Sequence, residues 1–502
     1  MSPSAPAAVG RSGGPDSASS GTARGGLLNL LGTGVSALAQ LVCVLVVTRG
    51  ADPANAGSLF AGVSVLLIGA ALAQLGTDVS LVRQVSVCGQ RQRRADAVRV
   101  TRDAVVAVLA LGLVLTASLL LLPSTWTARV LGSADPTASA LLVLAVPVLA
   151  LHELALAVTR GTGSMRPTVV LERVARPLLQ VVTLSLAVTS TDDPRALSVA
   201  WVLPWVAVLP ASAAAAVLHL RRIPDGGPVA EATSRRAFWR FSATRAVART
   251  CQVALQRADI IIVAALAGAP AAAVYTAATR FMVVGQLAGT AVQQAAQPFF
   301  ARLHAAGARE DLQALLRRTT VWSVAVVWPP YLVMALAAPW LLPVFGEGYE
   351  AGAPVLTVLS VAMLLATAAG PVDVVLLMAG RGATSLVITA TALAVDVVLC
   401  LLLVPHLGIL GAAVAWAAAI VVRNVASVEA VRRSPGLSAA SRDLSRVVVG
   451  ALVVVALPVG MATGLLAPPA VLAAVVTGAA VLWLLLLWRD RDRLGLGGLR
   501  RR

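Results

Sequence analysis

Apolar residues occur along this chain in runs of about 20, and short polar stretches separate the runs. A helix of about 20 apolar residues crosses the ~30 Å hydrocarbon core of a bilayer. The pattern therefore predicts about fourteen membrane-spanning helices, with ends uncertain by a few residues. These helices are expected near residues 26–48, 57–82, 104–122, 138–159, 169–190, 197–219, 241–266, 272–298, 319–342, 352–379, 384–404, 409–428, 446–466 and 470–488.

The composition agrees with this pattern. Hydrophobic residues make up 58% of the 502 residues, charged residues only 13%, and the mean hydropathy is +0.85. A water-facing surface needs far more charge than this. We therefore expect an all-α integral membrane protein with two pseudo-symmetric six-helix lobes, followed by two C-terminal helices.

The net charge of +17 is distributed as membrane topology requires. Every basic residue apart from His is Arg, and the Arg residues cluster in alternate connections between the apolar runs, whereas a nucleic-acid-binding protein presents one continuous basic face. The positive-inside rule then places both termini in the cytoplasm, in a multi-pass protein of the cytoplasmic membrane. No nucleic-acid partner is predicted. The arginine-rich set of connections holds residues 83–99, 221–236, 302–318, 432–433 and 500–502.

Several chemistries are disfavoured by the residue types present. Without Lys, the chain has no Walker A motif and no Schiff-base lysine. The four Cys and four His are scattered without metal-ligand spacing, so no metal and no cofactor is expected. An enzyme is not predicted. A polytopic polysaccharide polymerase or transferase is the alternative from another class, and it requires acids or His concentrated near one membrane face.

The chain divides into two similar halves. Arg99 before the third span corresponds to Arg318 before the ninth, and similar matches recur at an offset of about 216 to 221 residues. Two copies of six helices share one orientation, so a pseudo-two-fold axis along the membrane normal is expected, with a substrate path between the lobes. The predicted segments are a disordered cytoplasmic tail (1–24), an N-terminal lobe (25–220), a cytoplasmic linker (221–240), a C-terminal lobe (241–435), and two extra helices with a basic tail (436–502).

A polar stripe lies on the first helix of each half. In the seventh predicted span, five polar residues between Arg245 and Asp259 recur at spacings of 4, 3, 4 and 3 residues. On a helix they lie within roughly 80° of arc. A charge facing lipid costs at least ~2.5–3.5 kcal/mol, so both stripes are expected to face a cavity between the lobes. Helix–helix hydrogen bonding, with Arg side chains reaching the membrane surface, is the alternative. The stripes consist of Arg245, Arg249, Gln252, Gln256 and Asp259, and of Asn29, Thr33, Ser36 and Gln40.

Two further arginines and three acids lie inside predicted spans. Arg257 and Arg280 are candidates for substrate binding because intramembrane Arg is rare and usually functional. Arg257 could instead pair with Asp259 or Asp373. The acids Glu153, Asp259 and Asp373 are candidates for carrying a coupling proton or sodium ion, or else for neutralising a nearby Arg.

Three stretches resemble the polysaccharide flippases of the multidrug/oligosaccharidyl-lipid/polysaccharide exporter superfamily. They are Gly76–Arg83 (GTDVSLVR), Asp259–Arg280, and Arg160–Gly163 with its repeat Arg381-Gly382, and the likeness covers about residues 25–435. The resemblance implies alternating access between two lobes and transport of undecaprenyl-diphosphate-linked oligosaccharides from the inner to the outer leaflet. It also implies a polysaccharide polymerase and glycosyltransferases as pathway partners, and membrane lipids as surroundings.

The candidate residues agree with such a substrate. Arg245, Arg249, Arg257 and Arg280 offer forked donors to a dianionic diphosphate. The amides of Gln252, Gln256, Gln293 and Gln294 offer hydrogen bonds to sugar hydroxyls. A lipid II flippase and a cation-coupled multidrug antiporter remain the alternatives among transporters, although a drug-cation site calls for acids and aromatics, and only 4% of the residues are aromatic.

Overall fold

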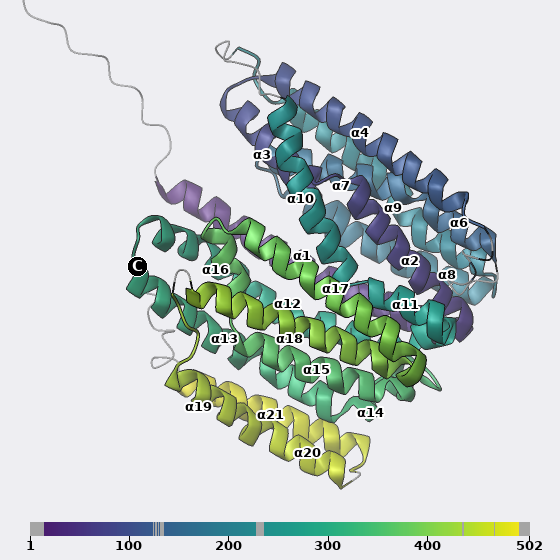
Figure 1. Ribbon diagram of the computed structural model, residues 1–502, viewed down its shortest axis with the longest axis vertical. Coiled ribbons are helices and arrows are strands. Elements are labelled where there is room, and N and C mark those ends of the chain that lie inside the picture. The colour runs from purple at the N-terminus through teal and green to yellow at the C-terminus, as the bar shows by residue number, and fades with distance from the viewer. Residues whose placement is uncertain are drawn as a thin grey trace, which may run out of the picture.

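The computed structural model describes residues 15–490 except 124, 126–127, 129, 131–134, 227–234, 434–435 and 466. This part of the chain is helical, and it forms no β-sheet (Figure 1). Helices lie side by side in two groups, and a third, smaller group at the C-terminal end covers the outside of the second. The predicted all-α fold is confirmed.

The N-terminal lobe is arranged around one central helix. The helix α7 packs against α2, α3, α4 and α9, so its residues are mostly buried. The elements of this lobe are α1 (Pro15–Gly50), α2 (Pro53–Ala73), α3 (Thr77–Gln90), α4 (Arg94–Leu120), α6 (Pro136–Leu144), α7 (Val146–Gly161), the π-helix η1 (Thr168–Ala175), α8 (Arg176–Ser190) and α9 (Pro194–Arg221).

The C-terminal lobe packs around α12, α13, α15, α17 and α18. Its elements are α10 (Arg235–Leu255), α11 (Ala258–Ala267), α12 (Ala269–Ala305), α13 (Arg309–Leu336), α14 (Ala338–Leu341), the 3-10 turns η2 (Leu342–Phe345) and η3 (Tyr349–Gly352), α15 (Ala353–Ala368), α16 (Val372–Met378), α17 (Gly382–Leu407) and α18 (Ile409–Arg433).

A C-terminal helical hairpin follows the second lobe and packs on α13. Trp483 is buried in this contact and donates its indole N–H to the carbonyl oxygen of Ala325 at 2.8 Å. Inside a membrane, apolar side chains pack against lipid about as well as against protein. This hydrogen bond therefore makes the contact between the hairpin and α13 specific. The hairpin consists of α19 (Arg442–Ala451), the π-helix η4 (Leu452–Ala456), α20 (Leu457–Gly464) and α21 (Pro469–Arg489).

Each of the fourteen predicted spans contains a helix. Among the described residues, eleven helical stretches are long and apolar enough to cross a membrane, and the pair α10 and α11, bent by 45°, is a twelfth candidate. The other two predicted spans correspond to η1 with α8, and to α12. Both carry several charged or amide side chains, which lower their hydropathy and mark them as helices with a polar face.

The structure differs from the prediction at the N-terminal tail. Helix α1 begins at Pro15, so residues 15–24, predicted as disordered, are helical. Proline is well accommodated in the first turn of a helix, because its missing N–H has no intrahelical partner there. Residues 1–14 of the predicted tail, residues 227–234 of the predicted linker and the basic end 491–502 lie outside the described residues.

The predicted second span is broken in the structure. It runs as α2 and α3, and Leu75 and Gly76 between them both have positive φ. A Cβ at Gly76 would lie 2.3 Å from the carbonyl oxygen of Ser242 in α10, so only glycine permits this approach. The hydroxyl groups of Ser80 and Ser242 are hydrogen-bonded beside it, which ties α3 to α10.

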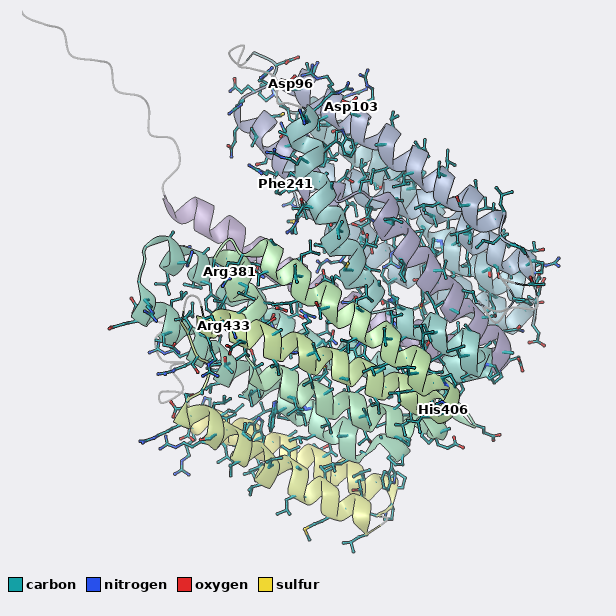
Figure 2. All side chains as sticks on the ribbon, in the orientation of Figure 1. Asp96, Asp103, Phe241, Arg381, His406 and Arg433 are labelled. Carbon is teal, nitrogen blue, oxygen red and sulfur yellow. The ribbon has the colours of Figure 1, made fainter. Side chains whose placement is uncertain are left out.

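Charged side chains lie at the two ends of the helices. Figure 2 shows Asp96, Asp103, Arg381 and Arg433 toward one end and His406 at the other. At the first end, Arg235 donates to Asp103 at 2.7 Å and so ties the start of α10 to α4.

The opposite end carries a bridge between the starts of α6 and α9 in the N-terminal lobe. Arg195 donates to the carboxylate of Asp135 at 2.6 Å. The same hydrogen bond lowers the pKa of Asp135 below its ordinary value, so this bridge stays charged except in strong acid.

At this same end the two lobes meet. Arg49 at the end of α1 donates to the carbonyl oxygen of Val344 in η2 at 2.7 Å. Beside it, α2 crosses α12 so closely that a Cβ at Gly57 would lie 1.7 Å from the carbonyl oxygen of Ala269. The lobes are therefore in backbone contact here, and a side chain at position 57 would separate them.

We expect Gly57→Ala to lower the midpoint of thermal unfolding in detergent. One added methyl group must push the backbones of α2 and α12 apart, and overpacking of this kind costs typically about 1–3 kcal/mol. The control is Gly34→Ala in α1, where a Cβ would meet no atom within 4 Å. Equal midpoints for the two variants would contradict the contact.

Candidate functional site

A cavity of about 290 Å³ lies between the lobes, and we call it the central cavity. Helices of the N-terminal lobe form one wall, and α10 and α12 form the other. Its charged groups leave an excess of two positive charges. They are Arg176, Arg249, Arg257, Arg280, Glu153 and Glu172.

Arg257 and Arg280 share a single acidic neighbour, Asp259, which interacts electrostatically with both. Arg280 in α12 is 9% exposed, and its Nε is buried without a hydrogen-bond partner. Among the described residues, neither Arg257 nor Arg280 forms an ion pair. One carboxylate cannot balance two guanidinium groups, so these two positions are suited to an anion. Of the two alternative partners considered for Arg257, Asp373 pairs with Arg423 instead, and Asp259 interacts with Arg257 electrostatically without an ion pair.

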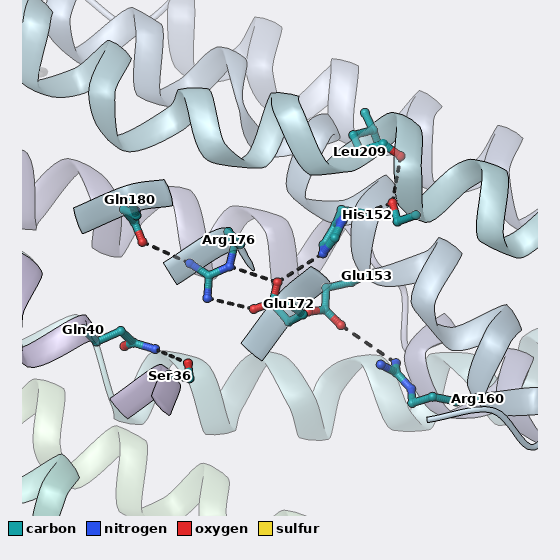
Figure 3. Close-up of polar contacts among 10 residues, drawn as sticks. Ser36, Gln40, His152, Glu153, Arg160, Glu172, Arg176, Gln180 and Leu209 are labelled. Carbon is teal, nitrogen blue, oxygen red and sulfur yellow. Dashed lines mark hydrogen bonds and ion pairs between the residues drawn. The ribbon is translucent and has the colours of Figure 1, made fainter. Parts of the chain in front are cut away.

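The opposite wall holds a network that begins in the π-helix η1 (Figure 3). Glu172 accepts two hydrogen bonds from Arg176, each of 2.9 Å, and Arg176 also donates to Gln180 at 3.0 Å. The guanidinium of Arg176 lies 4.2 Å from the centre of the Trp205 ring, a cation–π contact. The network holds Arg176 rigidly at the cavity wall.

His152 joins the network from α7. Its Nε2 lies 3.1 Å from a Glu172 carboxylate oxygen, and its Nδ1 lies 3.1 Å from the hydroxyl of Ser212. Ser212 donates its proton to the carbonyl oxygen of Leu209, so Nδ1 of His152 donates to Ser212.

We expect Glu172→Ala to lower the thermal unfolding midpoint strongly, since it leaves Arg176 buried and unpaired. Removing one partner of a buried pair costs about 3–5 kcal/mol. The double variant Glu172→Leu/Arg176→Met removes both charges and recovers most of the loss. If the double variant unfolds at the same temperature as Glu172→Ala, the unpaired charge of Arg176 does not cause the loss of stability.

The polar stripe on the seventh span is divided by the bend between α10 and α11. Arg249 and Gln256 line the central cavity, whereas Gln252 faces a different cavity described below. Arg245 lines neither and lies against the turn at Gly76. Asp259 lies beyond the bend and leaves the stripe, so the prediction that all five residues share one face is wrong. The continuous helix assumed in that prediction stops at Leu255.

The stripe on α1 also divides. Arg173 donates to the carbonyl oxygen of Asn29 at 3.0 Å and to the hydroxyl of Thr33, so this end of the stripe ties η1 to α1. Gln40 donates to Ser36 at 3.3 Å and lines the central cavity, while Ser36 does not. Asn29 and Thr33 therefore form hydrogen bonds between helices, which is the alternative considered for the stripe.

A second cavity of about 350 Å³ lies within the C-terminal lobe, and we call it the C-lobe cavity. Its lining comes from α10, α12, α13, α15, α16 and α18 and from the turn before α16. Gln256 lines both cavities, so they adjoin there. Gln252 and Gln293 line the C-lobe cavity, and Gln294 lines neither.

The three acids predicted to carry a coupling ion have different surroundings. Glu153 lines the central cavity with Arg160 3.8 Å away, and Asp373 pairs with Arg423 and accepts from Ser427 at 2.9 Å. Asp259 accepts from the hydroxyl of Tyr275 at 2.6 Å and from the amide of Ile260 at 2.8 Å.

Asp259 also has an acidic neighbour. Asp396 in α17 is fully buried, interacts electrostatically with Asp259, and has one carboxylate oxygen without a partner. Two buried acids with an unfilled oxygen are suited to a cation or a proton.

The sequence reasoning missed the network of Glu172, Arg176 and Gln180. A signal was present, because these residues recur every four positions and thus share one helical face. Gln180 is 3% exposed, which the isolated sequence could not indicate. The two tryptophans of the cavity wall, Trp201 and Trp205, were missed as well.

Solved structures with a similar fold are membrane transporters. The structure of "Lipid II flippase MurJ, inward closed conformation" superposes with a TM-score of 0.72 over 93% of this chain and 99% of that chain, at 9% identity. An inward-facing multidrug resistance MATE family transporter of the MOP superfamily gives a TM-score of 0.64 over 80% and 96%, at 16% identity. A MOP superfamily transporter from Pyrococcus furiosus, whose title reports reverse polarity of the binding pocket, gives 0.57 over 81% and 93%, also at 16%.

Sequence comparisons identify the family. No curated protein sequence matches the chain. The family named MatE matches residues 245–402, within the second lobe. The family named polysaccharide biosynthesis protein matches residues 22–304, which is more than half of the chain and includes most residues of the central cavity. The protein therefore belongs to the polysaccharide biosynthesis protein family.

Proposed function

We propose that this protein is a flippase that moves a polyprenyl-diphosphate-linked oligosaccharide from the inner to the outer leaflet of the cytoplasmic membrane. The lipid-linked precursor of a cell-surface polysaccharide is its substrate. Both termini lie in the cytoplasm, as the arginine-rich connections require. The protein transports and does not catalyse a covalent step.

The excess positive charge of the central cavity carries this proposal. A diphosphate that joins a lipid to a sugar has two negative charges, and the cavity has two positive charges in excess. Arg280 is nearly buried with an unpartnered donor, and Arg257 lies in the same wall. Forked Arg donors match phosphate oxygens, and they act strongly where water is scarce.

Alternating access requires contacts between the lobes to form and break, and at the arginine-rich end α10 is tied to α3 and α4. The backbone contact of Gly57 with Ala269 and the bond from Arg49 to Val344 close the end opposite the arginine-rich connections. Separation of these contacts opens the central cavity toward the outer leaflet. Helix α1 contacts α8 of one lobe and α12 of the other, so its movement is coupled to both.

The acids Asp259 and Asp396 form the coupling site in this proposal. Asp259 interacts electrostatically with both Arg257 and Arg280, and Asp396 interacts with Asp259. A proton or sodium ion on the acids weakens their attraction for the arginines and frees the guanidinium groups for the diphosphate. Asp373 and Glu153 do not take this role, because arginines already neutralise them.

Two other substrates compete with this one. The fold shared with MurJ favours lipid II, which also contains a lipid diphosphate. The match to the MatE family and the ring of Trp205 in the cavity wall favour a cationic drug. The excess positive charge of the central cavity argues against the drug.

A translocation assay tests the proposal. Purified protein in liposomes receives a fluorescent undecaprenyl-diphosphate oligosaccharide, with and without a proton or sodium gradient. Protein-dependent loss of label accessible to an added quencher supports a flippase. Faster translocation of lipid II identifies the first competitor. Efflux of a cationic dye without movement of either glycolipid identifies the second and contradicts the proposal.

A further inference from the structure

The C-lobe cavity differs from the central cavity in its chemistry. Its charged lining groups are Asp373 and Arg423, and these pair with each other, so its net charge is zero. Most of its other polar groups are amides and hydroxyls. These groups are Gln252, Gln256, Gln286, Gln293, Asn424, Thr290, Ser323 and Thr367.

Many of these groups lack partners inside the protein. In the part of the chain that the structure describes, the side-chain amides of Gln252, Gln286 and Gln293 form no hydrogen bond. The hydroxyl of Ser323, a residue that is 3% exposed, lines the cavity and is likewise unpartnered. The accessible amides and the buried Ser323 hydroxyl are left free to bind a polar occupant or water, and the unpartnered hydroxyl is costly without one.

The size and surroundings of the cavity match a small polar molecule. Its volume of about 350 Å³ lies within the ordinary range for small-molecule sites. Trp416 lines it and presents an aromatic ring, a surface against which the C–H face of a sugar packs. Side-chain amides and hydroxyls both donate and accept, as sugar hydroxyls do.

We propose that the C-lobe cavity binds the sugar units next to the diphosphate, and that these units are uncharged. This inference rests on the proposed function and adds the class of saccharide. Because the cavities adjoin at Gln256, a diphosphate in the central cavity places its first sugar at the entrance of the C-lobe cavity. An acidic sugar would bring a carboxylate into a cavity whose single arginine is already paired with Asp373.

Binding of matched lipids tests the inference on the purified full-length protein in detergent. The probes are undecaprenyl diphosphate without sugar, the same lipid with an N-acetylhexosamine, and the same lipid with a hexuronic acid. The test variant is Gln286→Leu/Gln293→Leu. The control is Gln297→Leu, on the same helix α12 but outside both cavities. Gln252→Leu on α10 is a second test variant, in case the double variant does not fold.

We expect Gln286→Leu/Gln293→Leu to weaken binding of the neutral glycolipid about tenfold and Gln252→Leu to weaken it about threefold, since each lost hydrogen bond is worth a factor of a few. Binding of the sugar-free lipid stays within twofold, and the control binds both as the wild type does. The wild type prefers the neutral sugar to the uronic acid.

Three outcomes overturn the inference, and they differ from failure of the proposed function. Equal weakening for the sugar-free lipid means that the glutamines serve the diphosphate. No weakening for either lipid means that the sugar lies elsewhere. Stronger wild-type binding of the uronic acid contradicts an uncharged saccharide. In all three cases the lipid diphosphate still binds, whereas failure of the wild type to bind any of these lipids rejects the proposed function itself.

Discussion

Replacing both Arg257 and Arg280 by alanine is expected to slow glycolipid translocation about 100-fold or more. Each arginine offers charge-assisted hydrogen bonds to the diphosphate, and such a bond is worth about 1.5–3 kcal/mol. Losing both therefore costs about 3–6 kcal/mol of substrate binding, and 1.4 kcal/mol corresponds to a factor of ten. The measurement is the initial rate of quencher protection of labelled glycolipid in liposomes.

Two controls separate this effect from a general loss of positive charge. Arg317→Ala/Arg318→Ala removes two exposed arginines at the start of α13, outside both cavities, and leaves the rate near the wild-type value. Arg257→Lys/Arg280→Lys keeps the charge but loses the forked geometry, so an intermediate rate is expected. A wild-type rate in the alanine variant would show that the anion binds elsewhere.

Replacing Asp259 by asparagine is expected to abolish the response of transport to an ion gradient. The rate then stays at the value measured without a gradient. Asparagine keeps the hydrogen-bonding shape of the side chain toward Tyr275 and Ile260, but it has no charge and takes up no proton or sodium ion at physiological pH. The same liposome assay, run with and without a proton gradient and a sodium gradient, measures the response.

The partner acid and a surface acid provide the comparison. Asp396→Asn is expected to have the same effect as Asp259→Asn, and the double variant adds nothing, because the two acids act on one ion. Asp443→Asn changes an exposed acid in α19, and the gradient response stays unchanged. A full gradient response in Asp259→Asn would place the coupling ion elsewhere or show transport without one.

The class of the protein and the placement of its helices were evident from the sequence alone. Apolar runs separated by arginine clusters have one physical explanation, which is the cost of exposing polar groups to lipid. That cost acts on each segment separately, so it is readable without knowing the packing. A charge on an apolar helix must face away from lipid, and on this ground Arg249, Arg257 and Arg280 were expected at the cavity that they line, whereas Arg245, expected there too, lines neither cavity.

The partner of each polar group was decided only by the tertiary structure. Asp373 lies 50 residues from Arg423, and Glu172 lies 20 from His152, so helical periodicity cannot indicate either pair. Asp259 fits the stripe of α10 by spacing, yet the bend of 45° after Leu255 turns it toward Tyr275 and Asp396. Periodicity describes one continuous helix, whereas bends and ion pairs depend on which helices pack together. This packing divided the polar residues between a basic cavity and a neutral one.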